Sequence, residues 1–380
     1  MPSADPRPEG SLSGKPSFVM AATKEARGPG GGNDPAGKRH SATVNRLRGY
    51  ALVLILIYHG GAILDVPNVI HGESGVDIFL MISGYVLALS CVDLPAAVFL
   101  RRRFLRIFPA YWVALILFVF LQVQLTQQPC TWTDFILHFL GLHSFSRTKY
   151  LFGINQSFWF VSIILFLYVV FLGVRNRLDD LDFVARSGAL TTAALAVYLI
   201  ASEHYVSVAY MVPRVPDFFI GLVAGQWASG RGVNWRPRTM LAVALIVLGY
   251  VSVAYGVDYA DVLRGGVYTG IFVCAETGLA VTAIGRSVLW ALALIGTYSY
   301  ELYLVHQPLM RDYSRIAMLR LFDIAEPSKM QLFLGMLAGF AVACLAAYWL
   351  HSLTGLITRK TTGRGPGGFA GLDKRKDIPA

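Results

Sequence analysis

A lone histidine lies within an apolar run near the start of the chain. Residues 52–57 are all Leu, Ile or Val, and His59 follows one tyrosine later. An ionisable side chain at the bilayer centre costs roughly 2.5–3.5 kcal/mol, so it needs a partner, a water-filled cavity or a function. An imidazole, with an unperturbed pKa of about 6.5, suits general-base catalysis, which contributes roughly 10²–10⁴ in rate. We therefore predict that His59 is a catalytic base or a nucleophile; an interhelical hydrogen bond is the structural alternative.

Two charged residues have positions from which they could act with His59. Arg48 precedes it by 59 − 48 = 11 positions, which puts both side chains on nearly one helix face, about 16 Å apart along the axis. Asp77 lies near the start of the next apolar stretch, and we expect it to face His59. A carboxylate beside an imidazole fixes its tautomer and stabilises its protonated form. The alternative for Asp77 is a structural contact with a neighbouring helix N-terminus.

A cluster of arginines precedes the third apolar stretch. Residues 99–112 contain Arg101, Arg102, Arg103 and Arg106, followed by Pro109. Guanidinium groups pair well with phosphate oxygens. A nucleotide-bearing thioester such as an acyl-CoA carries several phosphates, so the cluster, together with Arg48, is a candidate donor-binding site. The membrane-topology rule explains the same residues without a ligand.

Three later residues are candidates for substrate contacts: Trp159, Glu301 and His306. Glu301 and His306 are five positions apart in one apolar stretch and so do not share a helix face. Either lines a cavity or packs between helices, and Trp159 equally fits an interfacial belt. The four cysteines are widely spaced, so we expect neither a disulfide framework nor a metal site.

The elements that position these residues are predicted to be membrane-spanning helices. Hydrophobic residues make up 55% of the 380 residues and charged residues 15%, with a mean hydropathy of +0.54. Stretches of about 20 apolar residues match the thickness of a bilayer core. We predict an all-α, polytopic bundle of about ten transmembrane helices, near 49–66, 75–93, 108–125, 158–174, 188–203, 213–229, 239–256, 265–284, 289–310 and 331–353.

The distribution of basic residues predicts the orientation of the bundle. The net charge is +10, but Lys and Arg gather in alternate connections between apolar stretches, and the connection at 65–73 has none. No soluble domain presents them to nucleic acid, so we expect no nucleic-acid partner. By the positive-inside rule both termini are cytoplasmic, in a bacterial plasma membrane.

Both ends of the chain have polar compositions. Residues 1–44 and 357–380 are rich in Gly, Pro and charge, and we predict that they are disordered cytoplasmic tails flanking a transmembrane domain at 45–356. The first tail lacks the features of a secretory signal.

Taken in order, these segments resemble the acyltransferase 3 family of integral membrane O-acyltransferases. Arg48 and His59 are similar to the family's opening motif, and 75–85 to its second-helix signature. Arg103, Arg106, Pro109 and Tyr111 resemble its paired-arginine motif. The segments 214–221 and 298–308 look like later family segments. The resemblance implies an essential His59, an acyl-CoA donor and an acceptor that is a surface polysaccharide, a peptidoglycan sugar, a lipid-linked saccharide or a small metabolite.

One segment departs from this pattern. Many family members carry an acidic residue and a glutamine in the helix that begins with a tryptophan, but this chain has Ile164 and Phe166 there. That helix cannot supply a carboxylate, so acceptor specificity does not carry over from members that have the acid.

Three functions fit these observations. The first is transfer of an acyl group, acetyl above all, from acyl-CoA to a glycan or lipid-linked saccharide hydroxyl, with His59 as base. The second is a proton-coupled transporter or lipid flippase that uses the buried ionisable residues as a relay. The third is a non-catalytic receptor or scaffold, which the retained Arg48, His59 and Arg103–Arg106 pattern disfavours. The oligomeric state and the acyl chain length stay open.

Overall fold

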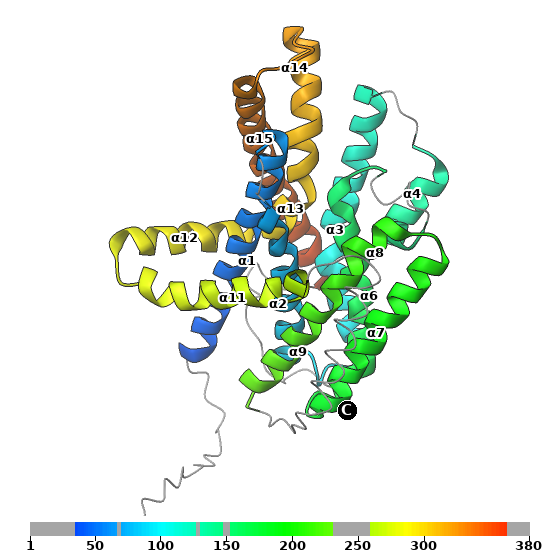
Figure 1. Ribbon diagram of the computed structural model, residues 1–380, viewed down its shortest axis with the longest axis vertical. Helices are drawn as coiled ribbons and strands as arrows, with labels where there is room; N and C mark the ends of the chain where they lie inside the picture. The colour runs from blue at the N-terminus through cyan, green and yellow to red at the C-terminus, as the bar shows by residue number, and fades with distance from the viewer. Residues whose placement is uncertain (1–34, 67–69, 127–129, 147–152, 231–258, 363–380) are drawn as a thin grey trace, which may run out of the picture.

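The computed structural model describes residues 35–66, 70–126, 130–146, 153–230 and 259–362, and within these ranges the chain forms helices and no strand (Figure 1). The all-α prediction is therefore confirmed. The longer helices are α1 (Pro35–Ile63), α2 (Ser74–Ser90), α3 (Ala96–Leu121), α6 (Trp159–Val174), α7 (Leu181–Ala201), α9 (Val215–Ala228), α11 (Tyr259–Leu279), α12 (Ala283–Thr297) and α15 (Lys329–Thr362). Shorter ones are α4 (Trp132–Phe139), α8 (Tyr205–Met211), α13 (Ser299–Gln307) and α14 (Ser314–Phe322).

Fewer helices than predicted have the length and composition of a membrane span. Five qualify among the described residues: Ala96–Gln124, Gln156–Arg177, Leu181–Ala201, Tyr205–Ala228 and Lys329–Ile357, and a sixth arises if one bent pair counts as a span. The predicted count of about ten is not confirmed. α2 is apolar but has only 17 residues, and the stretch predicted at 239–256 lies outside the described residues.

The predicted span at 289–310 is not one straight helix. α12 and the helical segment that starts at Ser299 meet at an angle of 75°. In Figure 1, α12 projects sideways with α11, whereas α14 runs along the long axis of the molecule. Periodicity of apolar residues is the same on both sides of such a bend, so the sequence pattern could not reveal it.

The predicted tails are shorter than expected at both inner boundaries. α1 begins at Pro35, within the stretch assigned to the first tail, and α15 continues to Thr362. Packing accounts for part of the longer α1, because Thr43 donates a hydrogen bond to Glu276 (3.2 Å), next to the ion pair of Arg46 with Glu276 (2.7 Å). Disorder in residues 1–34 and 363–380 stays a prediction, because these residues lie outside the described ranges.

Glycines allow α2 and α9 to pack backbone against backbone. A Cβ added to Gly84 of α2 would collide with the carbonyl of Phe218, and one added to Gly221 of α9 would collide with the carbonyl of Met81. Gly221 and Gly225 form a small-xxx-small pattern, which favours close helix approach in membranes. This contact fixes the position of α2, and with it Asp77.

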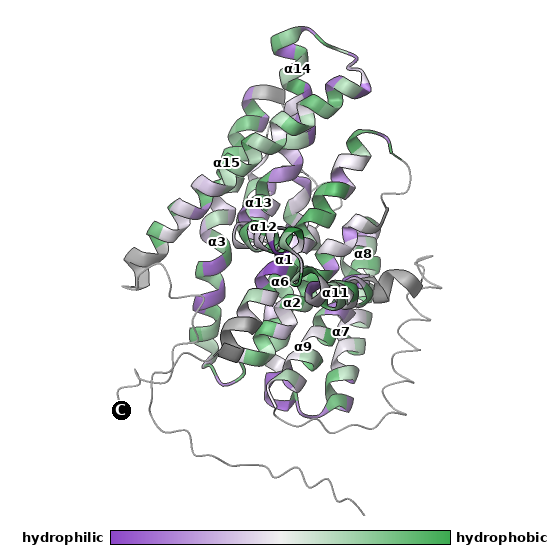
Figure 2. Cartoon of the chain, turned by 90° about the vertical axis from the view of Figure 1, so that its left-hand side faces the viewer, coloured by the Kyte–Doolittle hydropathy of each residue, from purple (hydrophilic) through white to green (hydrophobic). Residues whose placement is uncertain are grey.

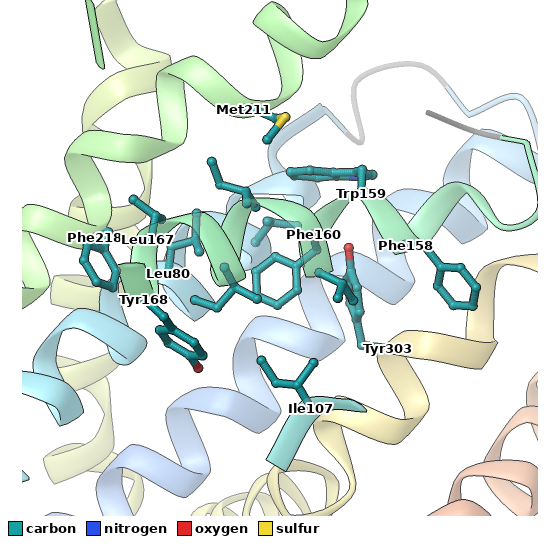
Figure 3. Packing of buried hydrophobic residues seen from close by; sticks show 14 of the residues in the cluster. Leu80, Ile107, Phe158, Trp159, Phe160, Leu167, Tyr168, Met211, Phe218 and Tyr303 are labelled. Carbon is teal, nitrogen blue, oxygen red and sulfur yellow. The ribbon is translucent and has the colours of Figure 1, made fainter. Parts of the chain in front are cut away.

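Large apolar side chains cover the outside of the bundle. Figure 2 shows α14 and α15 as mostly hydrophobic, and their exposed residues include Leu321 (74%), Leu345 (64%) and Trp349 (70%). Such surfaces suit contact with lipid acyl chains. Inside, α6 forms the centre of the core: its Phe160 packs against Tyr303 of α13, and Phe158, Tyr168 and Phe218 belong to the same buried cluster (Figure 3).

Candidate active site

The structure brings His59 of α1 beside His306 of α13. Their ring centroids are 5.1 Å apart, with an angle of 49° between the ring planes. His306 is fully buried, and His59 is half-buried. The two residues are 247 positions apart in the sequence and meet because α1 packs along α12 and α13. The imidazole that the sequence singled out therefore faces a second imidazole instead of hydrocarbon.

Local backbone contacts hold the His306 ring. Its Nδ1 lies 2.8 Å from the carbonyl oxygen of Tyr303, one helical turn earlier. A carbonyl only accepts hydrogen bonds, so Nδ1 carries the proton and Nε2 presents a lone pair. That Nε2 is buried and has no hydrogen-bond partner among the described residues.

A cavity bordered by arginines lies on the other side of Tyr303. Arg48 of α1 and Arg103 and Arg106 of α3 line it, together with Tyr168 and Ile164 of α6. Further lining residues are Phe79, Ser83, Val86, Ile107, Phe160, Ser299, Tyr300 and Tyr303. Its volume is about 90 Å³, below the roughly 300–1,000 Å³ of typical ligand sites.

Three of the five arginines predicted to bind the donor line this cavity. Arg103 is held in place, because its guanidinium donates to Cys91 Sγ (3.1 Å) and lies 5.6 Å from the ring centroids of Phe99 and Tyr168. Arg102, by contrast, is exposed and does not line the cavity. Ile164, which stands where many relatives carry an acid, gives the cavity an apolar wall.

Tyr303 separates the cavity from the imidazole pair. Its ring lies 5.6 Å from that of His306 and 5.2 Å from that of Phe160, and Phe79 lies 6.3 Å away. Tyr303 is only 4% exposed. Tyr303 therefore contacts both the arginine-lined cavity and His306, the partner of His59.

Asp77 has a different neighbour from the one expected. Its Oδ1 lies 3.1 Å from Nε of Arg214, whose NH2 group is also 3.3 Å from Glu73 Oε2. The close contacts of Gly75 with Ala51 and Ile55 set the register of α1 against α2. In this register Asp77 is level with about residue 51, some 12 Å along the axis from His59. We therefore correct the expectation that Asp77 faces His59.

Trp159, the predicted substrate-binding aromatic, covers Arg214. The Arg214 guanidinium carbon lies 5.2 Å from the centroid of its indole ring, which also contacts Tyr210 at 5.6 Å. Trp159 is 6% exposed. Its place beside a buried ion pair accounts for its burial, and a substrate contact stays a prediction.

Glu301 contacts α15, a helix that the sequence analysis did not predict as its partner. Oε1 of Glu301 lies 3.1 Å from Nδ1 of His351 on α15, and Tyr298 packs edge-on against the same imidazole. Glu301 and His306 thus project in different directions from α13, as their spacing predicts. A substrate role for Glu301 also stays a prediction.

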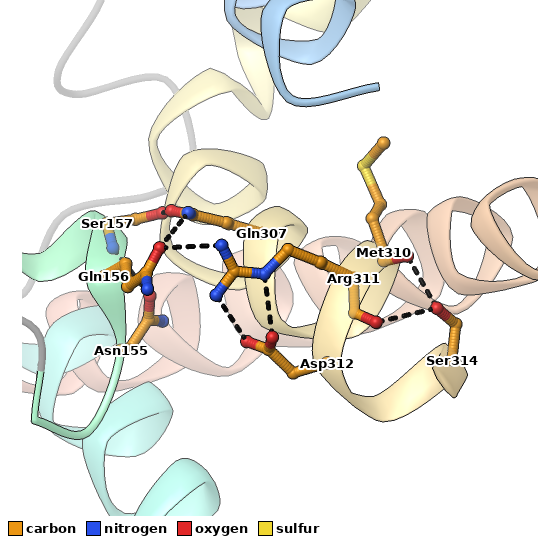
Figure 4. A network of polar contacts seen from close by, with 8 residues as sticks. All are labelled: Asn155, Gln156, Ser157, Gln307, Met310, Arg311, Asp312 and Ser314. Carbon is orange, nitrogen blue, oxygen red and sulfur yellow. Dashed lines mark hydrogen bonds and ion pairs between the residues drawn. The ribbon is translucent and has the colours of Figure 1, made fainter. Parts of the chain in front are cut away.

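Sequence reasoning missed two sets of polar residues, one beside Asp77 and one at the end of α13. Arg214 and the fully buried Asp217 flank α2, although their segment was recognised as family-like. In addition, Gln307 donates to Gln156 (2.7 Å), Arg311 donates to the same amide oxygen (3.0 Å), and Arg311 pairs with Asp312 (Figure 4). Gln307 directly follows His306, so this network anchors the end of α13; only the unusual polarity of 306–312 hinted at it.

Comparison with known proteins identifies the chain's relatives. Residues 42–352 match the sequence model of a family described as an acyltransferase domain. BcsY of Komagataeibacter xylinus, named a membrane-bound transacylase, is 24% identical over 348 residues, which cover 85% of each chain. The peptidoglycan O-acetyltransferase OatA of Listeria monocytogenes is 24% identical over 83% of this chain and 56% of its own length.

A third relative is the exopolysaccharide production protein ExoZ of Rhizobium meliloti, which is 24% identical over 62% of this chain and 75% of its own length. No solved structure matches the chain. The match at 42–352 covers all the residues that line the cavity and both imidazoles. The chain is thus a multi-pass membrane acyltransferase of the acyltransferase 3 family.

Proposed function

We propose that this protein transfers an acyl group, acetyl above all, from acyl-CoA to a hydroxyl of a cell-envelope glycan or lipid-linked saccharide. One observation carries the proposal: three arginines line a cavity that a single tyrosine ring separates from a pair of imidazoles. The names of OatA and ExoZ, which refer to peptidoglycan O-acetylation and exopolysaccharide production, support a glycan acceptor and an acetyl donor.

The arginines are suited to the donor's phosphates. Arg48, Arg103 and Arg106 come from two helices and converge on one cavity, and guanidinium–phosphate pairs are among the stronger hydrogen bonds in proteins. The apolar and aromatic walls suit the uncharged arm that carries the thioester. The positive-inside rule places this end of the bundle on the cytoplasmic side of a bacterial plasma membrane, with both termini there.

His59 is suited to the proton transfer. As base, one ring nitrogen takes the proton of the acceptor hydroxyl while the hydroxyl oxygen forms a bond to the acyl carbon. The carbon–sulfur bond then breaks, the electron pair goes to sulfur, and the imidazolium returns its proton to the thiolate. An acyl-histidine route transfers the same groups in two steps. Both routes require Tyr303 and its aromatic neighbours to move aside.

Labelled acetyl-CoA tests the proposal. Membranes that contain the protein are incubated with [¹⁴C]acetyl-CoA, and label in the envelope saccharide fraction is measured for the wild type and for His59→Gln at matched expression. We expect label that mild base releases, as an ester requires, and a loss of roughly 10²–10⁴ in rate for His59→Gln. An undiminished rate for that variant contradicts the proposal.

Mass spectrometry separates the proposal from the carrier alternative. Envelope glycans from cells with and without the protein should differ by the mass of the acyl group. Unchanged glycan masses together with an altered distribution of a lipid or saccharide across the membrane favour a transporter instead.

A further inference from the structure

We infer that His306 is a positioning residue that accepts a hydrogen bond from His59, fixes its tautomer and stabilises its imidazolium form. The inference rests on the proposed function and assigns to an imidazole the task that the sequence suggested for Asp77. It starts from the unpartnered lone pair of His306.

The tautomer of His306 follows from its own helix. The Nδ1 proton is committed to the carbonyl of Tyr303, so Nε2 is an acceptor. This nitrogen is buried without a partner. A buried acceptor that lacks a donor loses about 1–3 kcal/mol. The fold therefore keeps an open acceptor position at a cost, which a donor from the site would offset.

His59 is placed to provide that donor. A centroid separation of 5.1 Å leaves about 2.9 Å between ring nitrogens that face each other, which is a hydrogen-bond length. The present tilt of 49° needs only ring rotation about the side-chain bonds, and half-buried His59 has more freedom to rotate than enclosed His306. With one nitrogen of His59 donating to His306, the other nitrogen is free of its proton and can act as the base.

Two buried carboxylates of the neighbourhood have partners other than His59. Asp77 pairs with Arg214 about two turns from His59, and Glu301 pairs with His351 on another face of α13. In a carboxylate-oriented histidine the acid stays ionised while the ring becomes charged. Here His306 stays neutral while His59 gains and returns the proton, and the dipole of His306 stabilises the transient charge. The proton that His59 takes from the hydroxyl goes to the thiolate, so the pair gains and loses no net proton and the atoms balance as in the transfer above.

Two substitutions at position 306 separate hydrogen-bond acceptance from packing. His306→Gln keeps an oxygen acceptor near the place of Nε2, whereas His306→Phe keeps a ring and removes the acceptor. We expect His306→Phe to lower kcat about 100-fold with KM for acetyl-CoA changed less than about 2-fold, and His306→Gln to stay within about 10-fold of the wild type. Equal losses in both variants, or a change in KM alone, overturn the inference.

A double-mutant cycle shows whether His306 acts through His59. The same label-transfer assay is run with His306→Phe in the wild-type and His59→Ala backgrounds. If the two residues act as a unit, His306→Phe changes the residual rate of His59→Ala by less than about 2-fold. The same fractional loss in both backgrounds indicates a structural role and overturns the inference.

The outcomes also separate this inference from the proposed function. If His59→Ala keeps full transfer activity, the proposed function fails. If His59 is essential but the losses at position 306 are independent of it, only the role of His306 fails. Size-exclusion profiles in detergent confirm that each variant is folded, and His306→Gln serves where His306→Phe does not fold.

Discussion

Arg214 holds Asp77 through a contact of 3.1 Å between Nε and Oδ1, and their side chains are only 8% and 5% exposed. This pair connects the turn before α9 to the first turn of α2, and Glu73 adds a second contact to the same guanidinium. Because both charges are enclosed, removing one leaves the other without full compensation.

Asp77→Asn is therefore expected to lower the stability of the fold, and any loss of activity should follow from that lower stability. The loss should be about 1–3 kcal/mol, because Glu73 still contacts Arg214. Thermal unfolding in detergent should show a lower midpoint for Asp77→Asn and a partial recovery for the double variant Asp77→Leu with Arg214→Met. An unchanged midpoint combined with an inactive protein would return Asp77 to the orienting role that the sequence suggested.

Substitutions of neighbouring arginines should separate donor binding from topology. Arg103→Ala removes a guanidinium that lines the cavity, and we expect KM for acetyl-CoA to rise roughly 10- to 100-fold, the equivalent of about 1.5–3 kcal/mol. Arg102→Ala removes the same charge from an exposed neighbour and serves as the matched control. Equal effects of the two substitutions would mean that the cluster only sets orientation or a general potential.

The glycine contact between α2 and α9 should be sensitive to one methyl group. Gly221→Ala places a Cβ against the carbonyl of Met81, so the helices must separate, at a cost of about 1–3 kcal/mol. Gly173→Ala, where nothing lies within 4 Å of an added Cβ, should leave the unfolding midpoint unchanged or slightly raised. Equal midpoints for the two variants would show that α2 and α9 are less tightly packed than described.

Tyr303 should matter through its ring more than through its hydroxyl. Tyr303→Phe keeps the aromatic layer, and we expect acetyl transfer within about 3-fold of the wild type. Tyr303→Ala opens a void in the core at a cost of about 3–5 kcal/mol and joins the cavity to the imidazoles, so hydrolysis of acetyl-CoA should rise relative to transfer. The ratio of free acetate to labelled saccharide measures this. A Tyr303→Phe variant as inactive as Tyr303→Ala would assign a role to the hydroxyl.

Much of the helical framework was predictable, because a long apolar run in a membrane must satisfy its backbone hydrogen bonds internally and a helix does so. The convergence of Arg48, Arg103 and Arg106 was also predictable, since topology places all three at one end of their helices. The partner of His59 was not, because the contact with His306 joins segments 247 residues apart. Whether His306 meets His59 depends on the bend between α12 and α13, which the sequence does not reveal.

The misplacement of Asp77 has a simple geometric cause. Depth along an antiparallel pair depends on register, and Gly75 sets the register by contacting Ala51 and Ile55. Counting residues from the membrane surface predicts similar depths for Asp77 and His59. In the structure, however, Asp77 lies about two helical turns from the level of His59. The competing attraction of Arg214, which is 137 residues further along the chain, was not visible from composition or spacing.

The aromatic layer around Tyr303 also affects whether ions can leak through the protein across the membrane. Under the proposed function the enzyme meets a nucleotide on one face of the bilayer and a sugar on the other, and it must not let ions leak down the electrochemical gradient between the two faces. Tyr303, Phe79 and Phe160 pack against one another in the wall of the cavity, and their rings offer permeating ions no replacement for their hydration water. The resting protein is therefore expected to insulate the membrane, and a reaction cycle to open the seal only while substrates fill the gap.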